Sequence, residues 1–364
     1  MAQHIELLEK LMNALGPSGD EGAVRDIIKK EIVPFVDEIK VDKFGNLIAR
    51  RAGKGTKIMF VAHMDEIALM VKNINELGQM SFSAVGGVEA LTLVGETVRI
   101  LNNKNQFVCE GIVSCEELHE DLELEKLPKL NDLYIDAGVS RNELKKLGID
   151  VGCYVIPTHS FRYLGSKKYI SGKAVDDRVG CYVLVELIKQ LKQKKYAEDL
   201  YFVFSVQEEI GLYGVQVSLY QINPDWGIAI DTTNAEDSDP ADPLVTLGKG
   251  PVITLKDSEI ITSKLLDDHI KSLAKKHKIP HQPKVEDVGT TDATKIMLHK
   301  EGLPSTMVGL PVRNIHSSVG IVHLDDITNC IRLLQLLLDN PPCMSTPCVM
   351  KNIGVRKKRK NNRR

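Results

Sequence analysis

Two histidines and five acidic residues in this chain are of the types that bind and activate metal ions. They are His63, Asp65, Asp176, Glu208, Glu209, Asp231 and His316. A hydrolytic site with two metal ions needs about five protein ligands: one bridging carboxylate, and a nitrogen and an oxygen donor for each ion. Zinc and cobalt accept such mixed shells of imidazole and carboxylate. The residue types therefore predict two divalent ions, zinc or cobalt, in each subunit.

The residues divide into ligands and supporting groups. As ligands, His63 and His316 would supply nitrogen, Glu209 and Asp231 would supply terminal oxygen, and Asp176 would bridge the ions. The bridging position suits an acid at the start of a packed helix, because a packed helix holds its first residues rigidly.

Two acids remain without a ligand role. Asp65 lies two residues beyond His63 along a predicted strand, so it can orient the imidazole through its second nitrogen. Glu208 cannot easily bind the same ion as its neighbour Glu209, and it is therefore free to accept a proton from a water molecule held between the ions.

Each motif alone has a simpler explanation. The Asp176–Asp177 pair could cap a helix, with a solvated second aspartate. Glu208–Glu209 could be a solvated loop. Of the other histidines, His323 is expected to be a partly buried packing residue, and the rest lie in polar stretches and are expected at the surface: His4, His119, His159, His269, His277, His281 and His299. The metal site is favoured because acids follow three separate apolar runs.

The elements that would position these groups alternate between strands and helices. Buried strands are predicted over 57–62, 200–206 and 226–230, and further strands over 252–255 and 306–308. Apolar residues at helical spacing follow the aspartate pair: Val179, Tyr182, Val183, Leu187, Ile188 and Leu191. Three more helices are expected near 264–276, 294–299 and 327–338. This alternation predicts an α/β fold, a mixed sheet flanked by helices, with ligands beyond the carboxyl ends of its strands.

The N-terminal region predicts two helices and a hairpin. The first helix spans 5–15. The pattern Ser18-x-x-Glu21 is a capping box that would open a second helix, and strands 38–41 and 47–50 would form the hairpin.

The distribution of apolar, charged and turn-forming residues along the chain predicts three parts. Residues 1–68 and 167–345 form the catalytic domain. Residues 69–166 form an inserted small β domain with short strands, a helix over 141–147 and a charged surface loop over 116–129. Residues 346–364 form a basic, disordered tail with eight Lys or Arg after residue 350 and no acid.

Composition excludes several classes of protein. The chain has 364 residues, 26% of them charged, and a net charge of −2, which argues against nucleic-acid binding. No stretch approaches the roughly 18 apolar residues of a membrane span. The N-terminus lacks the pattern of a signal peptide. Seven cysteines stand singly, which is typical of free thiols. We therefore expect a cytoplasmic protein without a membrane partner.

Five motifs resemble the M42 metallo-aminopeptidases, which include glutamyl and tetrahedral aminopeptidases. The resemblance covers about residues 5–340 in the same order and spacing, and a Gly289–Ala293 segment adds to it. The motifs are His63-Met64-Asp65-Glu66, Val175-Asp176-Asp177-Arg178, Val206-Gln207-Glu208-Glu209-Ile210-Gly211, Asp231 and Ile315-His316-Ser317.

The resemblance implies a phosphorylase/hydrolase-like catalytic domain of the zinc-peptidase type. Asp176 would bridge the two ions, His63 and Asp231 would complete the shell of one, and Glu209 and His316 that of the other. Asp65 and Glu208 would take the supporting and general-base roles. The resemblance further implies short peptides as substrates and a homo-oligomer, in which dimers joined through the inserted domain build a hollow dodecamer.

Three segments depart from the family pattern. Gly289-Thr290-Thr291-Asp292-Ala293 replaces Gly-Gly-Thr-Asp-Ala, Ser318 and Gly320 replace a Pro and a Glu, and Tyr213 replaces an Arg. These segments resemble pocket walls in the family, so they bear on substrate preference and not on the metal ligands.

Three other functions must be distinguished from that of an aminopeptidase. A related dinuclear deacylase or carboxypeptidase could use the same ligands, and a scaffold protein could retain the fold. Glu208 argues against a scaffold. A glycosidase needs two free carboxylates beside a sugar, whereas these carboxylates are assigned to metal. The sequence therefore favours an aminopeptidase.

Overall fold

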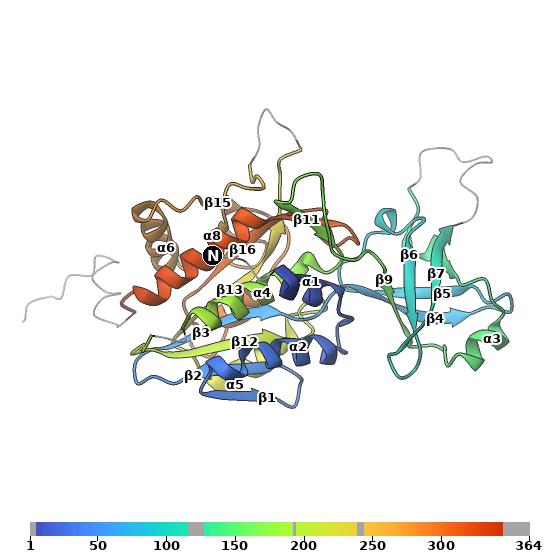
Figure 1. The fold of residues 1–364 in the computed structure, drawn as a ribbon, viewed down its shortest axis with the longest axis horizontal. Helices are drawn as coiled ribbons and strands as arrows, with labels where there is room; N and C mark the ends of the chain where they lie inside the picture. Colours follow the sequence, from blue (N-terminus) through green and yellow to red (C-terminus); the bar gives the residue numbers. More distant parts are fainter. Residues whose placement is uncertain (1–4, 116–126, 192–193, 239–243, 345–364) are drawn as a thin grey trace, which may run out of the picture.

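The chain forms a mixed sheet with helices on both faces and a separate small barrel, as a computed structural model shows (Figure 1). The structure describes residues 5–115, 127–191, 194–238 and 244–344. The predicted α/β class with an inserted small β domain is confirmed. The predicted tail and most of the predicted charged loop, residues 116–126, lie outside the described residues.

The main sheet has eleven strands, and its central four, β12, β3, β13 and β16, run parallel. The order across the sheet is β1-β2-β12-β3-β13-β16-β17-β11-β10, and β14 pairs with both β15 and β16. The strands are β1 (Glu38–Val41), β2 (Leu47–Arg51), β3 (Lys57–His63), β10 (Arg162–Tyr163), β11 (Tyr169–Gly172), β12 (Asp199–Ser205), β13 (Trp226–Asn234), β14 (Val252–Lys256), β15 (Gln282–Val285), β16 (Ser305–Arg313) and β17 (Gly320–His323).

Helices cover both faces of this sheet. They are α1 (Ile5–Asn13), α2 (Gly22–Ile32), α4 (Val175–Gln190), α5 (Tyr213–Ile222), α6 (Lys264–Lys276), α7 (Asp292–Met297) and α8 (Leu324–Asp339), with a 3-10 turn η1 (Val33–Phe35) after α2. Every helix predicted in this part of the chain is present, and the bounds of α6 match the prediction.

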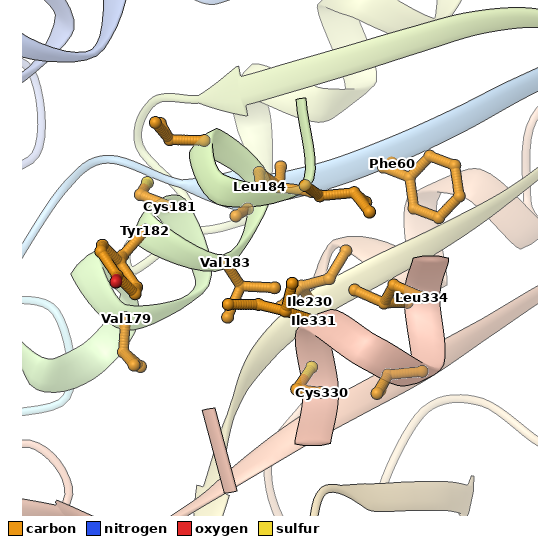
Figure 2. Close-up of a cluster of buried hydrophobic side chains, with 14 of the residues drawn as sticks. Phe60, Val179, Cys181, Tyr182, Val183, Leu184, Ile230, Cys330, Ile331 and Leu334 are labelled. Carbon is orange, nitrogen blue, oxygen red and sulfur yellow. The ribbon is translucent and has the colours of Figure 1, made fainter. Parts of the chain in front are cut away.

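Strand β3 shows why its sequence is apolar almost throughout. Phe60 faces one core with α1, α2, α4 and α8, whereas Met59 and Val61 face a second core with α5 and α7. A strand buried on both faces needs apolar residues at successive positions. In Figure 2, Phe60 of β3, Ile230 of β13, Val183 of α4 and residues of α8 gather in the first core. This packing fixes the strand ends from which the candidate ligands project.

Helix α4 is the most deeply buried of these helices. Between Val179 and Ile188 every residue except Glu186 is buried, because α4 packs against β3, β13 and α8. Asp176 and Asp177, joined by a cis peptide bond, have non-helical backbone angles, so the regular helix begins after them. The predicted helix after the aspartate pair is confirmed.

The predicted capping box at Ser18 and Glu21 is wrong. Helix α2 starts at Gly22, and no side chain caps it. The Ser18 hydroxyl instead donates to Asp65 Oδ2 at 2.6 Å. The Glu21 carboxylate accepts from the amides of Gly19 and Gln207. A hydroxyl bonded to a buried carboxylate forms a stronger hydrogen bond than it would with a backbone amide, and the tertiary contact therefore prevails. Helix α1 also ends at Asn13, two residues before the predicted end.

The inserted domain is a closed six-stranded barrel between β3 and β11. Its strand order is β4-β5-β8-β7-β6-β9. Its elements are β4 (Ala68–Ile74), β5 (Met80–Val85), η2 (Ala90–Thr92), β6 (Thr97–Leu101), β7 (Phe107–Cys115), η3 (Leu130–Asp132), β8 (Leu133–Asp136), α3 (Arg141–Lys146) and β9 (Tyr154–Pro157). The barrel has its own apolar core. Strand β10 follows the barrel within the interval 69–166 and pairs with β11 of the main sheet.

The described residues bear on two expectations, that the cysteines are free thiols and that no segment spans a membrane. Cys109, Cys115, Cys153, Cys181 and Cys330 carry free thiols, as expected. Cys343 is disulfide-bonded, so the expectation of free thiols throughout is wrong at that position. Among the described helices, none has the length and apolar character that crossing a membrane requires.

Candidate metal centre

The chain brings six of the seven candidate residues to one pocket of about 460 Å³. His63 ends β3, Asp176 stands at the start of α4, and Glu208 and Glu209 follow β12. His316 lies in the segment between β16 and β17. Asp231 lies within β13, not just beyond a strand end as predicted, because β13 continues to Asn234. The seventh residue, Asp65, is fully buried behind the pocket.

Asp176 lies between the two histidines. Its Oδ1 is 3.1 Å from Nε2 of His63, and its Oδ2 is 3.3 Å from Nε2 of His316. Each carboxylate oxygen therefore faces a different imidazole. That arrangement is compatible with a carboxylate that would bridge two ions.

Each histidine also has a second acidic neighbour. Asp231 Oδ1 lies 3.6 Å from His63 Nε2, and Glu209 Oε2 lies 3.5 Å from His316 Nε2. Glu208 approaches the His63 side, with Oε2 at 3.9 Å from Nε2. The side chains of the adjacent Glu208 and Glu209 thus diverge toward different histidines.

Donor atoms within 4.8 Å of one another form two groups that share His63. One group contains Asp176 and Glu209, and the other contains Asp177 and Asp231. The Asp177 carboxylate already accepts hydrogen bonds from the amides of Gly180, at 2.9 Å, and His63, at 3.3 Å. We therefore interpret Asp177 as a residue that fixes the backbone beneath the ligands.

Asp65 connects the loops that carry the ligands. Its Oδ1 accepts from the amide of Glu208 at 3.0 Å, and its Oδ2 accepts from the amide of Glu209 at 3.2 Å. His63 Nδ1 lies 3.2 Å from the backbone oxygen of Asp65 and 3.4 Å from its Oδ1. Asp65 therefore contacts three of the residues at the site.

A buried ion network anchors the loop after β3. Glu66 pairs with Lys173 at 2.7 Å and with Arg178 at 3.2 Å. Arg178, fully buried, also donates to the backbone oxygens of Leu11 and Met64. Because every charge has a partner, the network can hold α1, α4 and the Met64–Glu66 loop in a fixed relation.

The backbone at His316 is unusual. His316 has φ +56°, a left-handed conformation that non-glycine residues rarely adopt. Gly87, from the barrel segment after β5, packs against its ring, and a Cβ at Gly87 would lie 2.6 Å from His316 Nδ1. The inserted barrel therefore contributes a wall to the site.

Burial and like charge perturb the acids of the site. Burial raises the pKa of Glu209 to about 8 and that of Asp231 to about 6, and it raises the pKa of Glu208 well above its usual range. Burial lowers the pKa of His316, but Asp176 and Glu209 outweigh this and raise it to about 9. Burial opposes ionisation of Asp176, but hydrogen bonds from His316 and His63 hold the pKa of its carboxyl below its usual range.

These residues fit divalent cations. Glu209 Oε1 is buried and has no hydrogen-bond partner among the described residues. Several carboxylates share one buried pocket, and burial disfavours their charged forms. Positive ions would neutralise this charge, and the imidazole and carboxylate donors are those that zinc and cobalt bind.

Several residues at the site had no role in metal binding or catalysis assigned from the sequence. They are Ser18, Asp177 and Asp292, together with the Glu66, Lys173 and Arg178 network. Asp292 accepts a hydrogen bond from Ser205 at 2.6 Å, and burial raises its pKa to about 7. The Asp177 and Arg178 positions belonged to a recognised motif, but Ser18 gave only a misleading capping signal.

The other histidines behave mostly as expected. His323 is nearly buried and packs edge-on against Tyr169, which confirms the packing role. His299 was expected at the surface, but it is 6% exposed and packs against Tyr220, so that expectation is wrong. The ring fills space between the end of α7 and α5, which a local polar sequence does not reveal. His4 and His119 lie outside the described residues.

Comparison with known proteins agrees with this geometry. The sequence pattern of the M42 glutamyl aminopeptidases matches residues 45–333. The chain belongs to this family. It is a member of the M42 aminopeptidases, which are hydrolases of peptide bonds, and the resemblance found in the sequence is confirmed.

Similar proteins span nearly the whole chain. A putative aminopeptidase of Acetivibrio thermocellus is 41% identical, covering 90% of this chain and 96% of its own length. A solved aminopeptidase from Desulfurococcus kamchatkensis is 35% identical with a TM-score of 0.88, covering 93% of this chain and 95% of that chain.

One similar structure belongs to a peptidase that assembles into a shell. The Pyrococcus horikoshii TET1 peptidase is 33% identical with a TM-score of 0.82, covering 92% of this chain and 98% of that chain, and it can assemble into a tetrahedron or a large octahedral shell. A further solved structure of PhTET1 contains a dodecamer.

Proposed function

We propose that this chain is a two-metal aminopeptidase that removes N-terminal residues from short peptides. One observation carries the proposal: the two carboxylate oxygens of Asp176 face two different histidines, at 3.1 and 3.3 Å. His63 and Asp231 would hold one ion, and Glu209 and His316 the other. The ligand types favour zinc or cobalt.

The ions, when bound, supply Lewis acidity toward the scissile carbonyl and toward water. Glu208 is then the residue that moves the proton. It lies on the His63 side of the pocket, its side chain diverges from Glu209, and its amide is fixed by Asp65. Glu208 accepts a proton as water attacks the carbonyl carbon, and it returns that proton to the nitrogen of the leaving peptide as the C–N bond breaks.

The supporting residues hold these groups in place. Asp65 and Ser18 position the Glu208 and Glu209 backbone, and the Glu66 network fixes the loop after His63. Rigid placement matters because a proton acceptor must lie within hydrogen-bond reach of the reacting water.

We further propose that the barrel of β4–β9 mediates self-association into a hollow assembly. The proposal is supported by the assemblies of similar proteins and by the large apolar side chains exposed on the barrel, Leu77, Leu91, Phe107, Ile112 and Val151. Enclosure would limit substrates to short peptides. The proposed location is the cytoplasm.

A peptide assay with metal analysis tests the proposed function. The purified protein should bind two ions per chain and release the N-terminal residue of an unblocked peptide but not of an N-acetylated one. His63→Ala and His316→Ala should each lose one ion and nearly all activity. Release of C-terminal residues, or the absence of any tight metal site, would contradict the proposal.

A further inference from the structure

The pocket that holds the candidate metal ligands also contains a second pair of acids. Asp257 and Glu286 line the same cavity of about 460 Å³. Asp257 directly follows β14, and Glu286 directly follows β15. These strands run parallel, with Lys256 paired to Val285, and the amide of Glu286 donates to the backbone oxygen of Lys256 at 3.1 Å. The two acids therefore occupy neighbouring positions at the carboxyl ends of paired strands.

Glu286 is neutralised by a buried lysine. Lys284 Nζ lies 2.6 Å from Glu286 Oε2, and it also contacts Glu236 at 3.1 Å and the Thr233 hydroxyl at 2.8 Å. Lys284 is 5% exposed. Its charge is thus committed to the protein, and it does not line the cavity as a partner for an acidic ligand.

Asp257 is different, because one of its oxygens has no partner in the described part of the chain. The side chain is nearly buried, with the residue 3% exposed. Its Oδ1 accepts from the amides of Glu259 and Ile260, at 2.8 and 2.9 Å. No described residue donates a hydrogen bond to Oδ2, and no described lysine or arginine forms an ion pair with this carboxylate. Burial raises the pKa of Asp257, so a bound cation would relieve an unfavourable charge.

The remaining lining of the pocket suits a long cationic side chain. Apart from the candidate metal ligands and Glu208, Asp257 and Glu286 are the only charged residues among the described residues that line it. Apolar side chains of Val288, Met307 and Ile315 form part of the wall. Lysine and arginine combine an apolar stem with a cationic end, so the stem can contact this wall while the end reaches a carboxylate.

We propose that Asp257 makes this enzyme selective for peptides with an N-terminal lysine or arginine. The inference rests on the proposed aminopeptidase function and names its substrate class. Glutamyl substrates are disfavoured, although the family is named for them, because no lysine or arginine stands among the described lining residues to pair with their side-chain carboxylate.

The test compares release rates from three substrates. Metal-loaded protein is assayed with lysyl-, leucyl- and glutamyl-p-nitroanilide. A charge-assisted hydrogen bond corresponds to a preference of about tenfold or more, so kcat/KM for lysyl should exceed that for leucyl by at least this factor. Asp257→Asn keeps the volume and the acceptor at Oδ1, and it should reduce the lysyl-to-leucyl ratio to near one, mainly through KM.

A matched control separates the local contact from net charge. Asp287→Asn makes the same charge change at the residue after Glu286, but the Asp287 side chain is 92% exposed, pairs with Lys256 at the surface and is not among the lining residues. This variant should keep the wild-type lysyl-to-leucyl ratio. A loss of selectivity in Asp287→Asn equal to that in Asp257→Asn would overturn the role of Asp257.

A binding measurement does not depend on turnover. Calorimetry on the metal-loaded wild type should give tighter binding of L-lysine than of L-norleucine, which has a similar stem without the ammonium group. Equal binding of the two, or a wild-type preference for leucyl or glutamyl substrates, overturns the inference, whether or not Asp257→Asn folds. Activity on leucyl substrate without basic preference would leave the proposed function standing, whereas no activity on any unblocked substrate would reject that function.

Discussion

The carboxylate of Asp65 accepts a hydrogen bond of 3.0 Å from the backbone amide of Glu208. Asp65 follows β3 and Glu208 follows β12, two strands that pair in parallel up to His63 and Ser205. The contact therefore fastens together two neighbouring strand exits, one carrying a candidate ligand and the other the candidate base. The hydroxyl of Ser18, in the segment between α1 and α2, donates a hydrogen bond to the same carboxylate.

Weakening this contact should slow turnover more than it weakens substrate binding. Asp65→Asn should lower kcat about 10- to 100-fold, as is typical for residues that support metal ligands. Ser18→Ala should have a smaller effect in the same direction, because Asp65 keeps its two backbone donors. Steady-state kinetics measure both, and Ser140→Ala is the control, since Ser140 makes the same type of bond to Glu143 on the barrel. Unchanged kcat in Asp65→Asn would contradict the positioning role.

The barrel should influence the metal site through Gly87. A methyl group there would lie 2.6 Å from the His316 ring, so Gly87→Ala should displace His316 and weaken one metal site by about tenfold or more. Metal titration of the purified variant checks this. At Gly165 an added Cβ meets no atom within 4 Å, so Gly165→Ala should bind both ions normally. Two full-affinity sites in Gly87→Ala would show that the loop can move away.

Much of the catalytic fold could be predicted because its signals are local. Buried strands such as β3 and β12 are apolar runs, and α4 has apolar residues at helical spacing. The ends of these strands and the acids that follow them could therefore be located in the sequence. The positions of Ser18 and His299 could not be predicted in this way. Ser18 donates a hydrogen bond to the distant carboxylate of Asp65 and does not cap the helix that comes after it. His299 is buried by packing against Tyr220.

The positions of the two pocket acids also could not be predicted from local sequence signals. Asp257 and Glu286 stand 29 residues apart in ordinary polar segments, and only the pairing of β14 with β15 brings them together. The left-handed backbone at His316 and its contact with Gly87 are also tertiary effects. The ligand types could thus be predicted, but the wall that would select the substrate could not.

Metal-free protein should lose stability as pH rises from about 4.5 to about 9. The folded-state pKa of Glu209 is raised to about 8 from an ordinary 4.5, and that of His316 to about 9 from 6.5. The folded state therefore binds more protons than the unfolded state between these values, and stability falls as pH increases through them. Asp176, whose pKa is lowered, titrates below this range.

Thermal melts after chelation check this dependence. The melting temperature should be lower at pH 9 than at pH 6, and added zinc should remove most of the difference, because cations stabilise the charged carboxylates. Glu209→Gln should reduce the slope, since one titrating group is lost. A metal-free protein that grows more stable from pH 6 to pH 9 would be inconsistent with these shifts.

Self-association should depend on the barrel. If its exposed apolar residues are buried between subunits, Leu91→Glu together with Phe107→Glu should shift the protein to smaller species in sedimentation, with metal content retained. Leu298→Glu is the control, because Leu298 is equally exposed directly after α7, outside the barrel. A wild-type protein that is monomeric and fully active at micromolar concentration would exclude a functional assembly.

The metal content and turnover of Glu208→Gln test the two-metal account most directly. Glutamine retains the volume but cannot accept a proton near neutral pH, so kcat should fall by about 10² to 10⁴, while two ions per chain remain bound. Glu209→Gln should instead lose one ion together with activity, because Glu209 faces His316. If Glu208→Gln loses metal while Glu209→Gln keeps both ions and turns over slowly, the assigned roles of base and ligand are reversed.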